Sequence, residues 1–334
     1  MKICVLGAGS WGIALTIHLK RAGHTPTLWA YKAVQATRLV ETRENSTLLP
    51  GAILPADILI THNLNDALAD TVGVVMAVPS QSVRSTCWEA SAFIDRGTWV
   101  VCAAKGLEEN THLRMSEVLK QNLTNNPSIA VLSGPSHAEE VLKKMPTTVV
   151  TASGDAETAT AVQTAFHSDY FRVYTSEDLI GVELGGALKN VIAIAAGITD
   201  GLGLGDNAKA ALMTRGLHEI TRLGVALGAQ PATFAGLAGM GDLIVTCTSR
   251  HSRNRLLGEK LGKGASLETA LSEMVMVAEG AKTVRSALAL AQQKKVEVPI
   301  IEEVNQVLFE RKKAKDALKS LLSRPSKSEK DFEL

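Results

Sequence analysis

The chain has 334 residues, of which 46% are hydrophobic and 21% charged, as is typical of a globular protein with a substantial core. This length favours two domains. Its 35 Lys and Arg residues balance 34 Asp and Glu residues to a formal net charge of +1, which argues against a nucleic-acid partner. Aromatic residues make up only 4%, so Ala, Val, Leu and Ile must build the core, as suits helices and buried parallel strands.

The cysteines predict neither a disulfide framework nor a metal site. Cys4, Cys87, Cys102 and Cys247 are far apart and form no C-x-x-C pair. Glycines interrupt the apolar N-terminus, so no signal peptide is expected, and no apolar run reads as long enough to span a bilayer. A reducing cytoplasm is the expected location.

Short apolar strands alternate with helical stretches from Lys2 to about Thr175. This rhythm predicts βαβ units and a Rossmann-like, doubly wound, mostly parallel sheet over residues 1–175. The first helix is expected at Trp11–Ala22. The strands are expected at Lys2–Leu6, Thr27–Trp29, Ile58–Thr61, Val72–Val78, Trp99–Ala103, Ile129–Leu132, Thr147–Thr151 and Arg172–Tyr174.

The pattern changes after Ser176, where Ala, Leu and Gly dominate and no further strand is expected. An all-α domain is therefore predicted over residues 176–322. Its helices are expected at Asn207–Leu227, Ser252–Leu261, Gly280–Gln292 and Ile300–Phe309. Residues 323–334 are polar and contain the helix breaker Pro325, so a frayed tail is predicted.

A glycine fingerprint follows the first strand. Gly7-Ala8-Gly9-Ser10-Trp11-Gly12 matches G-x-G-x-x-G between a strand and a helix. Gly7 permits the tight turn, Gly9 allows a pyrophosphate to approach the backbone, and Gly12 lets helix pack on strand. The helix end offers free N–H groups and a positive dipole end to phosphates. A structural turn is the alternative, but the flanking strand, helix and βαβ rhythm favour a dinucleotide site.

The usual NAD-selective acid is missing. NAD sites commonly place Asp or Glu about 20 residues beyond the glycines to bind the ribose 2′-hydroxyl, yet residues 1–40 contain neither. Lys32 follows the second predicted strand and would face a 2′-phosphate instead. We expect NADP or NAD as cofactor, with NADP slightly favoured; the alternative is a solvated Lys32 in a dual-specificity site.

Two polar segments follow later strands. Lys105 comes after the strand Trp99–Ala103, where ligands of open α/β sheets bind. Gly134 and Ser136 lie in a turn after the next strand and would bring backbone N–H groups near a ligand. A solvated lysine and an ordinary loop are the alternatives for these two segments.

The most informative segment is Gly181–Asn190, an apolar, small-residue helix that contains Lys189. A buried lysine is costly without a purpose or partner, and desolvation would lower its pKa toward the range that proton transfer needs. The alternative is a lysine whose amine reaches solvent at the helix margin.

Further polar residues follow. Asp242 lies in a glycine turn and is either catalytic or an N-cap. Ser252 would cap the next helix, where Arg253 and Asn254 would add donors to a phosphate site. A basic surface helix start is the alternative for this last group.

Taken together, these motifs resemble one family, the bacterial-type NAD(P)-dependent glycerol-3-phosphate dehydrogenases. The resemblance implies a Rossmann-like N-terminal domain, a helical C-terminal domain, cofactor NADP or NAD, and a homodimer. The matching segments, in family order, are GAGSWG (7–12), AVPS (77–80), AKGLE (104–108), SGPS (133–136), GVELGGALKNVIAIAAG (181–197), ITRLG (220–224), GLAGMGDL (236–243), TCTSRHSRNR (246–255), VAEG (277–280) and VEVPIIEEVNQVL (296–308).

The resemblance also implies roles for individual residues. Lys189 matches the family's proton donor and acceptor, with Lys105 and Asp242 as its catalytic companions. Implied substrate contacts are Lys105, Gly134, Ser136, Lys189, Asp242, Ser252, Arg253 and Asn254. Implied cofactor contacts are Gly7, Gly9, Ser10, Trp11, Gly12, Lys32, Lys105, Ala138, Arg253, Val277 and Glu279. Departures from the common pattern are Cys102, Ala104, Ser136 and His137.

The expected reaction is reduction of dihydroxyacetone phosphate to glycerol 3-phosphate, which supplies glycerophospholipid synthesis. Lys189 would protonate the carbonyl oxygen, Lys105 would stabilise its charge, and Arg253 and Asn254 would bind the phosphate. One rival is a β-hydroxy-acid or 6-phosphogluconate dehydrogenase, which lacks the SRNR segment. A non-catalytic nucleotide sensor is the other, and it would not need Lys105, Lys189 and Asp242.

Overall fold

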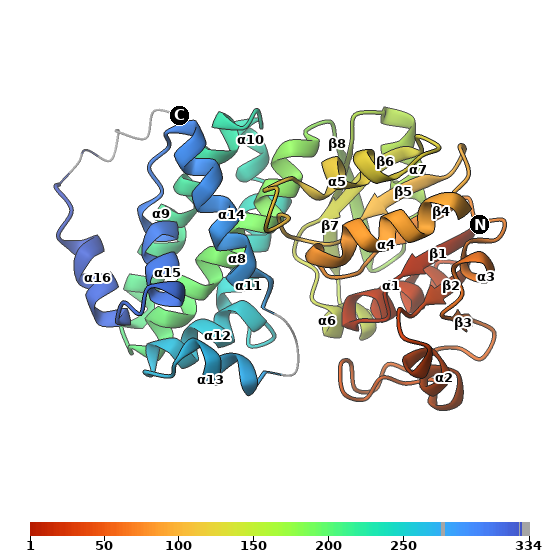
Figure 1. The fold of residues 1–334 in the computed structure, drawn as a ribbon, viewed down its shortest axis with the longest axis horizontal. Coiled ribbons are helices and arrows are strands. Elements are labelled where there is room, and N and C mark those ends of the chain that lie inside the picture. The colour runs from red at the N-terminus through yellow and green to blue at the C-terminus, as the bar shows by residue number, and fades with distance from the viewer. Residues whose placement is uncertain (275–277, 327, 329–334) are drawn as a thin grey trace. The chain divides into compact units, whose positions relative to one another are not determined.

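The computed structural model describes residues 1–274, 278–326 and 328, and these form two compact units (Figure 1). Unit 1 comprises Met1–Lys105 and Met115–Leu179, and unit 2 comprises Gly106–Arg114 and Ile180–Leu334. The second unit thus takes a short segment, residues 106–114, from the middle of the region in which the sequence predicts only βαβ units.

Unit 1 is built on one eight-stranded sheet in the described part of the chain, in the order β3-β2-β1-β4-β5-β6-β7-β8. Neighbouring strands are parallel except β6 and β7, which are antiparallel. The predicted doubly wound, mostly parallel sheet is confirmed. The strands are β1 Lys2–Leu6, β2 Thr25–Trp29, β3 Leu59–Thr61, β4 Gly73–Met76, β5 Trp99–Cys102, β6 Ser128–Ser133, β7 Thr147–Ser153 and β8 Phe171–Ser176.

The central strands are hydrophobic at nearly every position because helices cover both faces of the sheet. All residues of β4 and β5 are buried, the pattern of a parallel strand without a solvent face. Unit 1 also contains the 3₁₀ turns η1 Ser80–Ser82 and η2 Ser91–Phe93. Its helices are α1 Ser10–Arg21, α2 Ala33–Thr42, α3 Leu64–Leu68, α4 Val83–Ala90, α5 Met115–Asn122, α6 Ala138–Leu142 and α7 Ala156–Phe166.

Unit 2 is helical, as predicted. Its elements are α8 Leu179–Gly201, α9 Gly205–Ala226, α10 Pro231–Phe234, the π-helical turn η3 Leu237–Gly241, α11 Asp242–Thr248, α12 Arg253–Gly262, α13 Leu267–Ser272, α14 Glu279–Lys294, α15 Pro299–Phe309 and α16 Ala314–Leu322. No helix or strand includes the described tail residues 323–326 and 328, and the rest of the predicted tail lies outside the described residues.

The central helix α8 corrects one expectation from the sequence. Its 23 residues are long and apolar enough to cross a membrane, although no such run was expected. In the structure, 83% of its most apolar window is buried inside the protein. A helix that is apolar on all sides is the form a core helix takes when its neighbours surround it.

Glycines allow α12 to pack directly on the backbone of α8. A Cβ atom on Gly258 would lie 1.9 Å from the Ile194 carbonyl oxygen, and one on Gly197 would lie 1.9 Å from the Arg255 carbonyl oxygen. One turn further along, a Cβ on Gly201 would lie 2.3 Å from the Glu259 carbonyl oxygen, and one on Gly262 would lie 2.5 Å from the Ile198 carbonyl oxygen. The start of α12 is therefore fixed against the helix that carries Lys189.

Contacts with the helices of unit 2 hold the segment 106–114. Leu107 is fully buried in the hydrophobic core of that unit. Ser286 Oγ of α14 donates to the Glu108 carbonyl oxygen at 3.1 Å. Arg114 Nη1 lies 2.7 Å from Glu183 Oε2 of α8. The chain directly after Lys105 is thus held by the helical unit.

Candidate active site

The glycine loop after β1 has two glycines that the fold requires. Gly7 has φ +120°, and a Cβ there would lie 2.8 Å from the Ala77 carbonyl carbon. A Cβ on Gly12 would lie 1.8 Å from the Gly7 carbonyl oxygen. A Cβ on Gly9 would meet no protein atom within 4 Å. The protein itself therefore does not require glycine at position 9, whereas a phosphate approaching the backbone would.

The N-terminus of α1 is suited to an anion. Gly9 caps it without a side chain, and its first turn contains no acidic residue. The first N–H groups of the helix and its positive dipole end are therefore not neutralised by a carboxylate of that turn. Ser10 and Trp11 are its first residues, and the buried Trp11 Nε1 has no hydrogen-bond partner among the described residues. The loop and helix together fit a dinucleotide pyrophosphate.

Lys32 lies at the end of the turn after β2. Its side chain is exposed, and it precedes α2 without forming a side-chain cap. Gln35, which no sequence motif indicated, donates from Nε2 to the Ala8 carbonyl oxygen at 3.0 Å. This bond ties α2 to the glycine loop. Ala138, another predicted cofactor contact, is buried at the first position of α6.

Lys105, Gly134 and Ser136 come together in unit 1, beyond the ends of β5 and β6. Lys105 Nζ donates to the Gly134 carbonyl oxygen at 2.8 Å and to Ser136 Oγ at 3.2 Å. Ser136 Oγ in turn donates to the Gly134 carbonyl oxygen at 2.8 Å. Gly134 has φ +131°, which favours glycine. The Gly134 carbonyl oxygen and Ser136 Oγ thus contribute to fixing the position of the lysine amine.

Lys189 is buried on α8, with 6% of its surface exposed, so the alternative in which its amine reaches solvent is wrong. Its Nζ lies 2.5 Å from Asp242 Oδ1 and 2.6 Å from Thr246 Oγ1. Thr246 Oγ1 also lies 2.6 Å from the Asp242 carbonyl oxygen, to which it donates. The carboxylate stabilises the protonated amine and opposes the desolvation considered from the sequence alone.

Asp242 occupies the first position of α11 and is 1% exposed. Its side chain contacts Lys189, and Gly241 occupies the N-cap position. The N-cap alternative for Asp242 is therefore wrong. Thr246 was missed as a site residue, although it lies one turn after Asp242 and therefore on the same helix face.

The turn η3 brings Asp242 to α8 through close backbone contacts. A Cβ on Gly185 of α8 would lie 2.5 Å from the Ala238 carbonyl oxygen of η3. A Cβ on Gly239 would lie 2.2 Å from the Phe234 carbonyl oxygen. The glycine-rich sequence around Asp242 thus serves close packing, which places the carboxylate against the lysine.

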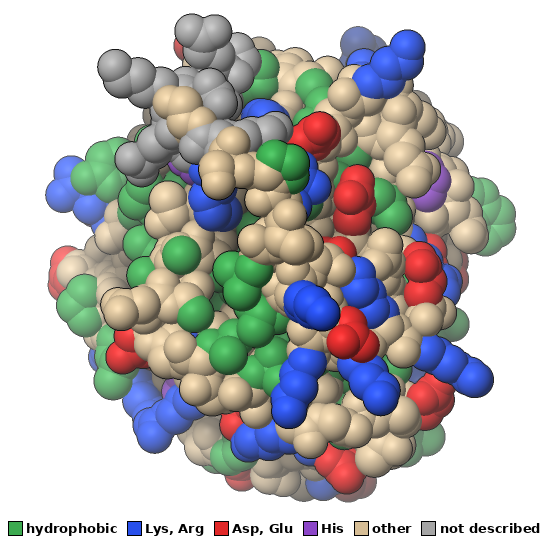
Figure 2. Space-filling model, turned by 90° about the vertical axis from the view of Figure 1, so that its left-hand side faces the viewer, with side chains coloured by type: hydrophobic (Ala, Val, Ile, Leu, Met, Phe, Trp, Pro, Cys, Tyr) green, Lys and Arg blue, Asp and Glu red, His purple; other side chains and the backbone are tan. Residues whose placement is uncertain are grey.

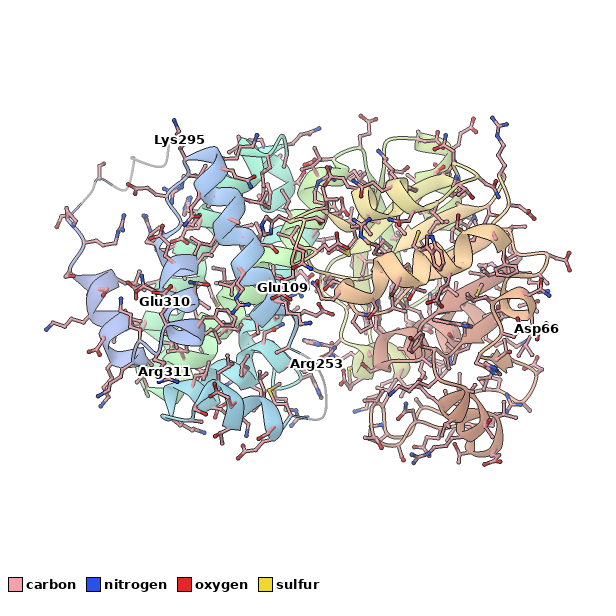
Figure 3. The ribbon with its side chains drawn as sticks, viewed as in Figure 1. Asp66, Glu109, Arg253, Lys295, Glu310 and Arg311 are labelled. Carbon is pink, nitrogen blue, oxygen red and sulfur yellow. The ribbon has the colours of Figure 1, made fainter. Side chains whose placement is uncertain are left out.

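The start of α12 has the predicted cap. Ser252 Oγ accepts from the Arg255 backbone N–H at 3.2 Å, and the first turn of α12 contains no acidic residue. Arg253 is the first residue of this helix and is partly exposed there (Figure 3). A capped helix end with an adjacent guanidinium can bind a phosphate monoester.

Asn254 was predicted only to add a donor to a phosphate site, but its amide also makes two hydrogen bonds within the protein. Its Nδ2 donates to Asn190 Oδ1 at 2.9 Å, and its Oδ1 accepts from the Gly280 backbone N–H at 2.9 Å. Asn190, which was not proposed as a site residue, directly follows Lys189. These bonds connect α8, α12 and the start of α14, where Glu279 is the first residue. Val277 lies outside the described residues.

Two further observations limit the chemistry. Burial raises the pKa of the Cys247 thiol, which lies next to Thr246, to about 12, so this cysteine stays protonated and is a poor nucleophile. No group of three or more His, Cys, Asp or Glu residues that could hold a metal ion occurs in residues 1–274, 278–326 and 328.

Family models match both parts of the chain. Residues 2–159 match the N-terminal model of NAD-dependent glycerol-3-phosphate dehydrogenase, and residues 178–319 match the C-terminal model. A glycerol-3-phosphate dehydrogenase [NAD(P)+] of a Thermoanaerobacter species is 54% identical over 329 residues, covering 98% of this chain and 99% of the relative. The enzyme of the same name from Fusobacterium nucleatum is 51% identical over 330 residues, covering 98% of both chains.

A solved structure has the same fold. The glycerol-3-phosphate dehydrogenase of Coxiella burnetii superposes with a TM-score of 0.93 at 37% sequence identity, covering 97% of this chain and 99% of that chain. The chain therefore belongs to the family of NAD(P)-dependent glycerol-3-phosphate dehydrogenases.

Proposed function

We propose that the chain catalyses the reversible, NAD(P)H-dependent reduction of dihydroxyacetone phosphate to sn-glycerol 3-phosphate and so supplies glycerophospholipid synthesis. The observation that carries this proposal is the buried cluster of Lys189, Asp242 and Thr246, which presents a protonated amine on a helix that is tied to a phosphate-binding helix end. We assign nucleotide binding to residues 1–175 and substrate binding and proton transfer to residues 176–322.

The glycine loop, Ser10 and Trp11 would hold the pyrophosphate. The open space beside Gly9 and the carboxylate-free first turn of α1 support this assignment. A bound nicotinamide supplies the hydride for the C2 carbonyl of the substrate. We further assign Lys32, Lys105, Ala138, Arg253, Val277 and Glu279 to cofactor contacts.

Lys189 donates the proton that the reduced carbonyl oxygen requires. Asp242 and Thr246 fix the direction of its amine through bonds of 2.5 Å and 2.6 Å, so little reorganisation accompanies the transfer. The nearby carboxylate keeps the amine protonated before the step. After the step, a proton from solvent restores the ammonium ion.

The phosphate lies remote from the reacting carbon and supplies binding energy for orientation. Arg253 and the Ser252-capped helix end bind it with charge-assisted hydrogen bonds. Asn254 contributes through its bonds to Asn190 and Gly280, which place these groups relative to Lys189. Lys105, held at Gly134 and Ser136, stabilises negative charge on the carbonyl oxygen.

Three finer assignments belong to this proposal. NADP is favoured slightly over NAD, because Lys32 is exposed and residues 1–40 contain no acid. The enzyme is a homodimer, as the family resemblance implies. It functions in the cytoplasm.

NADPH oxidation at 340 nm tests the reaction directly. We expect rapid oxidation with dihydroxyacetone phosphate and at least about 10³-fold lower kcat/KM with dihydroxyacetone, which lacks the phosphate. A panel of other phosphorylated ketones tests the rival dehydrogenases. Absence of oxidation with dihydroxyacetone phosphate, with either NADPH or NADH, would contradict the proposal.

A further inference from the structure

A cavity of about 570 Å³ lies within unit 2, among described residues that have no role in the proposed reaction. Four helices form its walls: α8, α9, α15 and α16. Figure 2 shows this end of unit 2, with hydrophobic side chains gathered in a hollow and Lys and Arg side chains beside it. The volume falls within the range of small-molecule pockets, about 300–1,000 Å³.

Most of the cavity wall is aliphatic. The larger side chains that face it include Ile198, Leu202, Leu212, Val304, Leu318 and Leu321. These side chains offer dispersion contacts and no hydrogen bonds, so the part of a ligand they surround must be apolar. No aromatic side chain lines the cavity in the described residues, which suits a flexible alkyl chain better than a flat ring.

The acidic residues that line the cavity already have partners. Glu297 pairs with Arg324 at 3.0 Å, and Glu303 pairs with Lys312 at 2.5 Å. Glu219 accepts hydrogen bonds from the backbone N–H groups of Ile300 and Ile301 at the start of α15, at 2.8–3.2 Å. Burial raises the pKa of Glu219 to about 7, which reduces its negative charge near neutrality.

Two further arginines, Arg215 and Arg222, line the same cavity. Arg222 Nη2 donates to the Glu297 backbone carbonyl oxygen at 2.8 Å, but its buried Nε has no hydrogen-bond partner among the described residues. A buried N–H of a guanidinium without a partner is costly, and an anionic oxygen is its best partner. The buried Nε of Arg222, whose charge also acts on Glu219, therefore favours an anion at this end of the cavity.

We propose that this cavity binds a single-chain amphiphile with an anionic head group, with its alkyl chain between α9 and α16 and its head group at Arg222. A carboxylate or a phosphate monoester fits the guanidinium equally well. The aliphatic wall favours an alkyl chain in the ligand, and the Arg222 Nε without a hydrogen-bond partner favours an anionic head group. A neutral alkyl chain satisfies only the first requirement, so the head group decides affinity at equal chain length.

Calorimetric titration of the full chain with octanoate, decanoate and dodecanoate, kept below their micellar concentrations, tests the site. We expect the Kd to fall about tenfold for each added pair of CH2 groups. Decyl phosphate and decanol are the matched probes for the head group. We expect decanol to bind at least about tenfold more weakly than decanoate. Comparing the Kd of decanoate with that of decyl phosphate then identifies which acidic head group the site prefers. Absence of saturable dodecanoate binding would overturn the proposal.

Two variants locate the binding. Ala211→Phe places a bulky ring in the cavity and should weaken decanoate binding at least tenfold. Ala210→Phe, on the preceding residue of α9 and outside the cavity lining, should leave decanoate binding unchanged. Arg222→Gln should weaken decanoate binding and leave decanol binding unchanged. This comparison remains valid even if Ala211→Phe fails to fold. Equal decanoate affinity in Ala211→Phe and Ala210→Phe would contradict the site.

The oligomeric state tests the other occupant, a second copy of the chain. If this face were a subunit interface, Ala211→Phe would convert a dimer to monomers in sedimentation, and the wild type would not bind alkanoates. That pair of results would overturn the proposal. Activity with dihydroxyacetone phosphate should be unchanged in all three variants, which shows that a loss of alkanoate binding is local and independent of the proposed reaction.

Discussion

The two lysines to which we assign roles in the reaction differ in their surroundings, one in each unit. Lys105 in unit 1 is half-buried and donates to a backbone carbonyl and a hydroxyl on a loop beyond two strands. Lys189 in unit 2 is buried within packed helices and donates to a carboxylate and a hydroxyl. In a buried site a carboxylate positions an amine and also keeps it protonated. The buried Lys189–Asp242 pair supports the proton-transfer role that we propose for Lys189.

The two units should also differ in how substitutions affect stability and activity. Functional side chains of unit 1 lie at the carboxyl ends of strands, where loops can vary without disturbing the sheet. Those of unit 2 lie on helices in close backbone contact. Substitution of Lys189, Asp242 or Asn254 should therefore reduce both stability and activity, whereas substitution of Lys105 or Ser136 should reduce activity alone.

The two lysines should show the largest contrast. We expect Lys189→Ala to lower kcat about 10⁴-fold, and Lys105→Ala to lower kcat/KM about 10²-fold. Lys189→Ala also leaves Asp242 buried without its cation, which should destabilise the protein by about 3 kcal/mol. Lys105→Ala leaves the Ser136–Gly134 hydrogen bond in place and should not destabilise the protein. Steady-state kinetics, NADPH binding and thermal unfolding measure these effects; equal stability losses would contradict the contrast.

The close contact between α8 and α12 predicts the next effect. Gly258→Ala puts a methyl group where the Ile194 carbonyl oxygen lies 1.9 Å away, so the helices must separate, at a cost of about 3 kcal/mol. Gly97→Ala is the matched control in unit 1, since its Cβ meets nothing within 4 Å. Far-UV circular dichroism follows unfolding of the helices. A neutral Gly258→Ala would show that the contact is not required.

Glu219 predicts a pH dependence within unit 2. Burial raises its folded pKa from 4.5 to about 7, so the folded state binds a proton that the unfolded state releases. Stability relative to Glu219→Gln should therefore fall as pH rises from about 4.5 to 7, by about 3 kcal/mol at most, and stay constant above. Urea unfolding of both proteins across this pH range measures it. A constant difference would mean that Glu219 does not titrate there.

The exposed Lys32 predicts the smallest effect, confined to unit 1. Lys32→Glu introduces the acid that NAD-selective sites carry, so the ratio of kcat/KM for NADPH to that for NADH should fall about tenfold. Lys120→Glu, an exposed change of the same charge in unit 1, is the control and should leave the ratio unchanged. A strong NADH preference in the wild-type enzyme would overturn the proposed NADP preference.

Local signals made much of unit 1 predictable. Near-continuous apolar runs bounded by polar turns indicated each strand of the sheet, and the glycine spacing indicated the loop before α1. The Ser252 cap was predictable because a serine followed by a polar helix start is a local pattern.

The remaining features depend on contacts distant in sequence. Lys189 and Asp242 are 53 residues apart, and no local pattern pairs them. Packing between elements produces the two hydrogen bonds of the Asn254 amide. It also places residues 106–114 in unit 2. The reversed direction of β7 and β8 also depends on how the chain returns to the sheet. Such features follow from tertiary structure, which residue type and spacing do not encode locally.

Rescue of Lys189→Ala by small primary amines tests the central claim, proton donation by Lys189, most directly. NADPH oxidation with dihydroxyacetone phosphate should rise with the concentration of methylammonium or ethylammonium in this variant, because the added amine replaces the missing acid. Lys105→Ala, in which no proton donor is removed, should gain far less from the same amines. A near-normal kcat in Lys189→Ala without added amine would contradict the assignment of Lys189 as the proton donor.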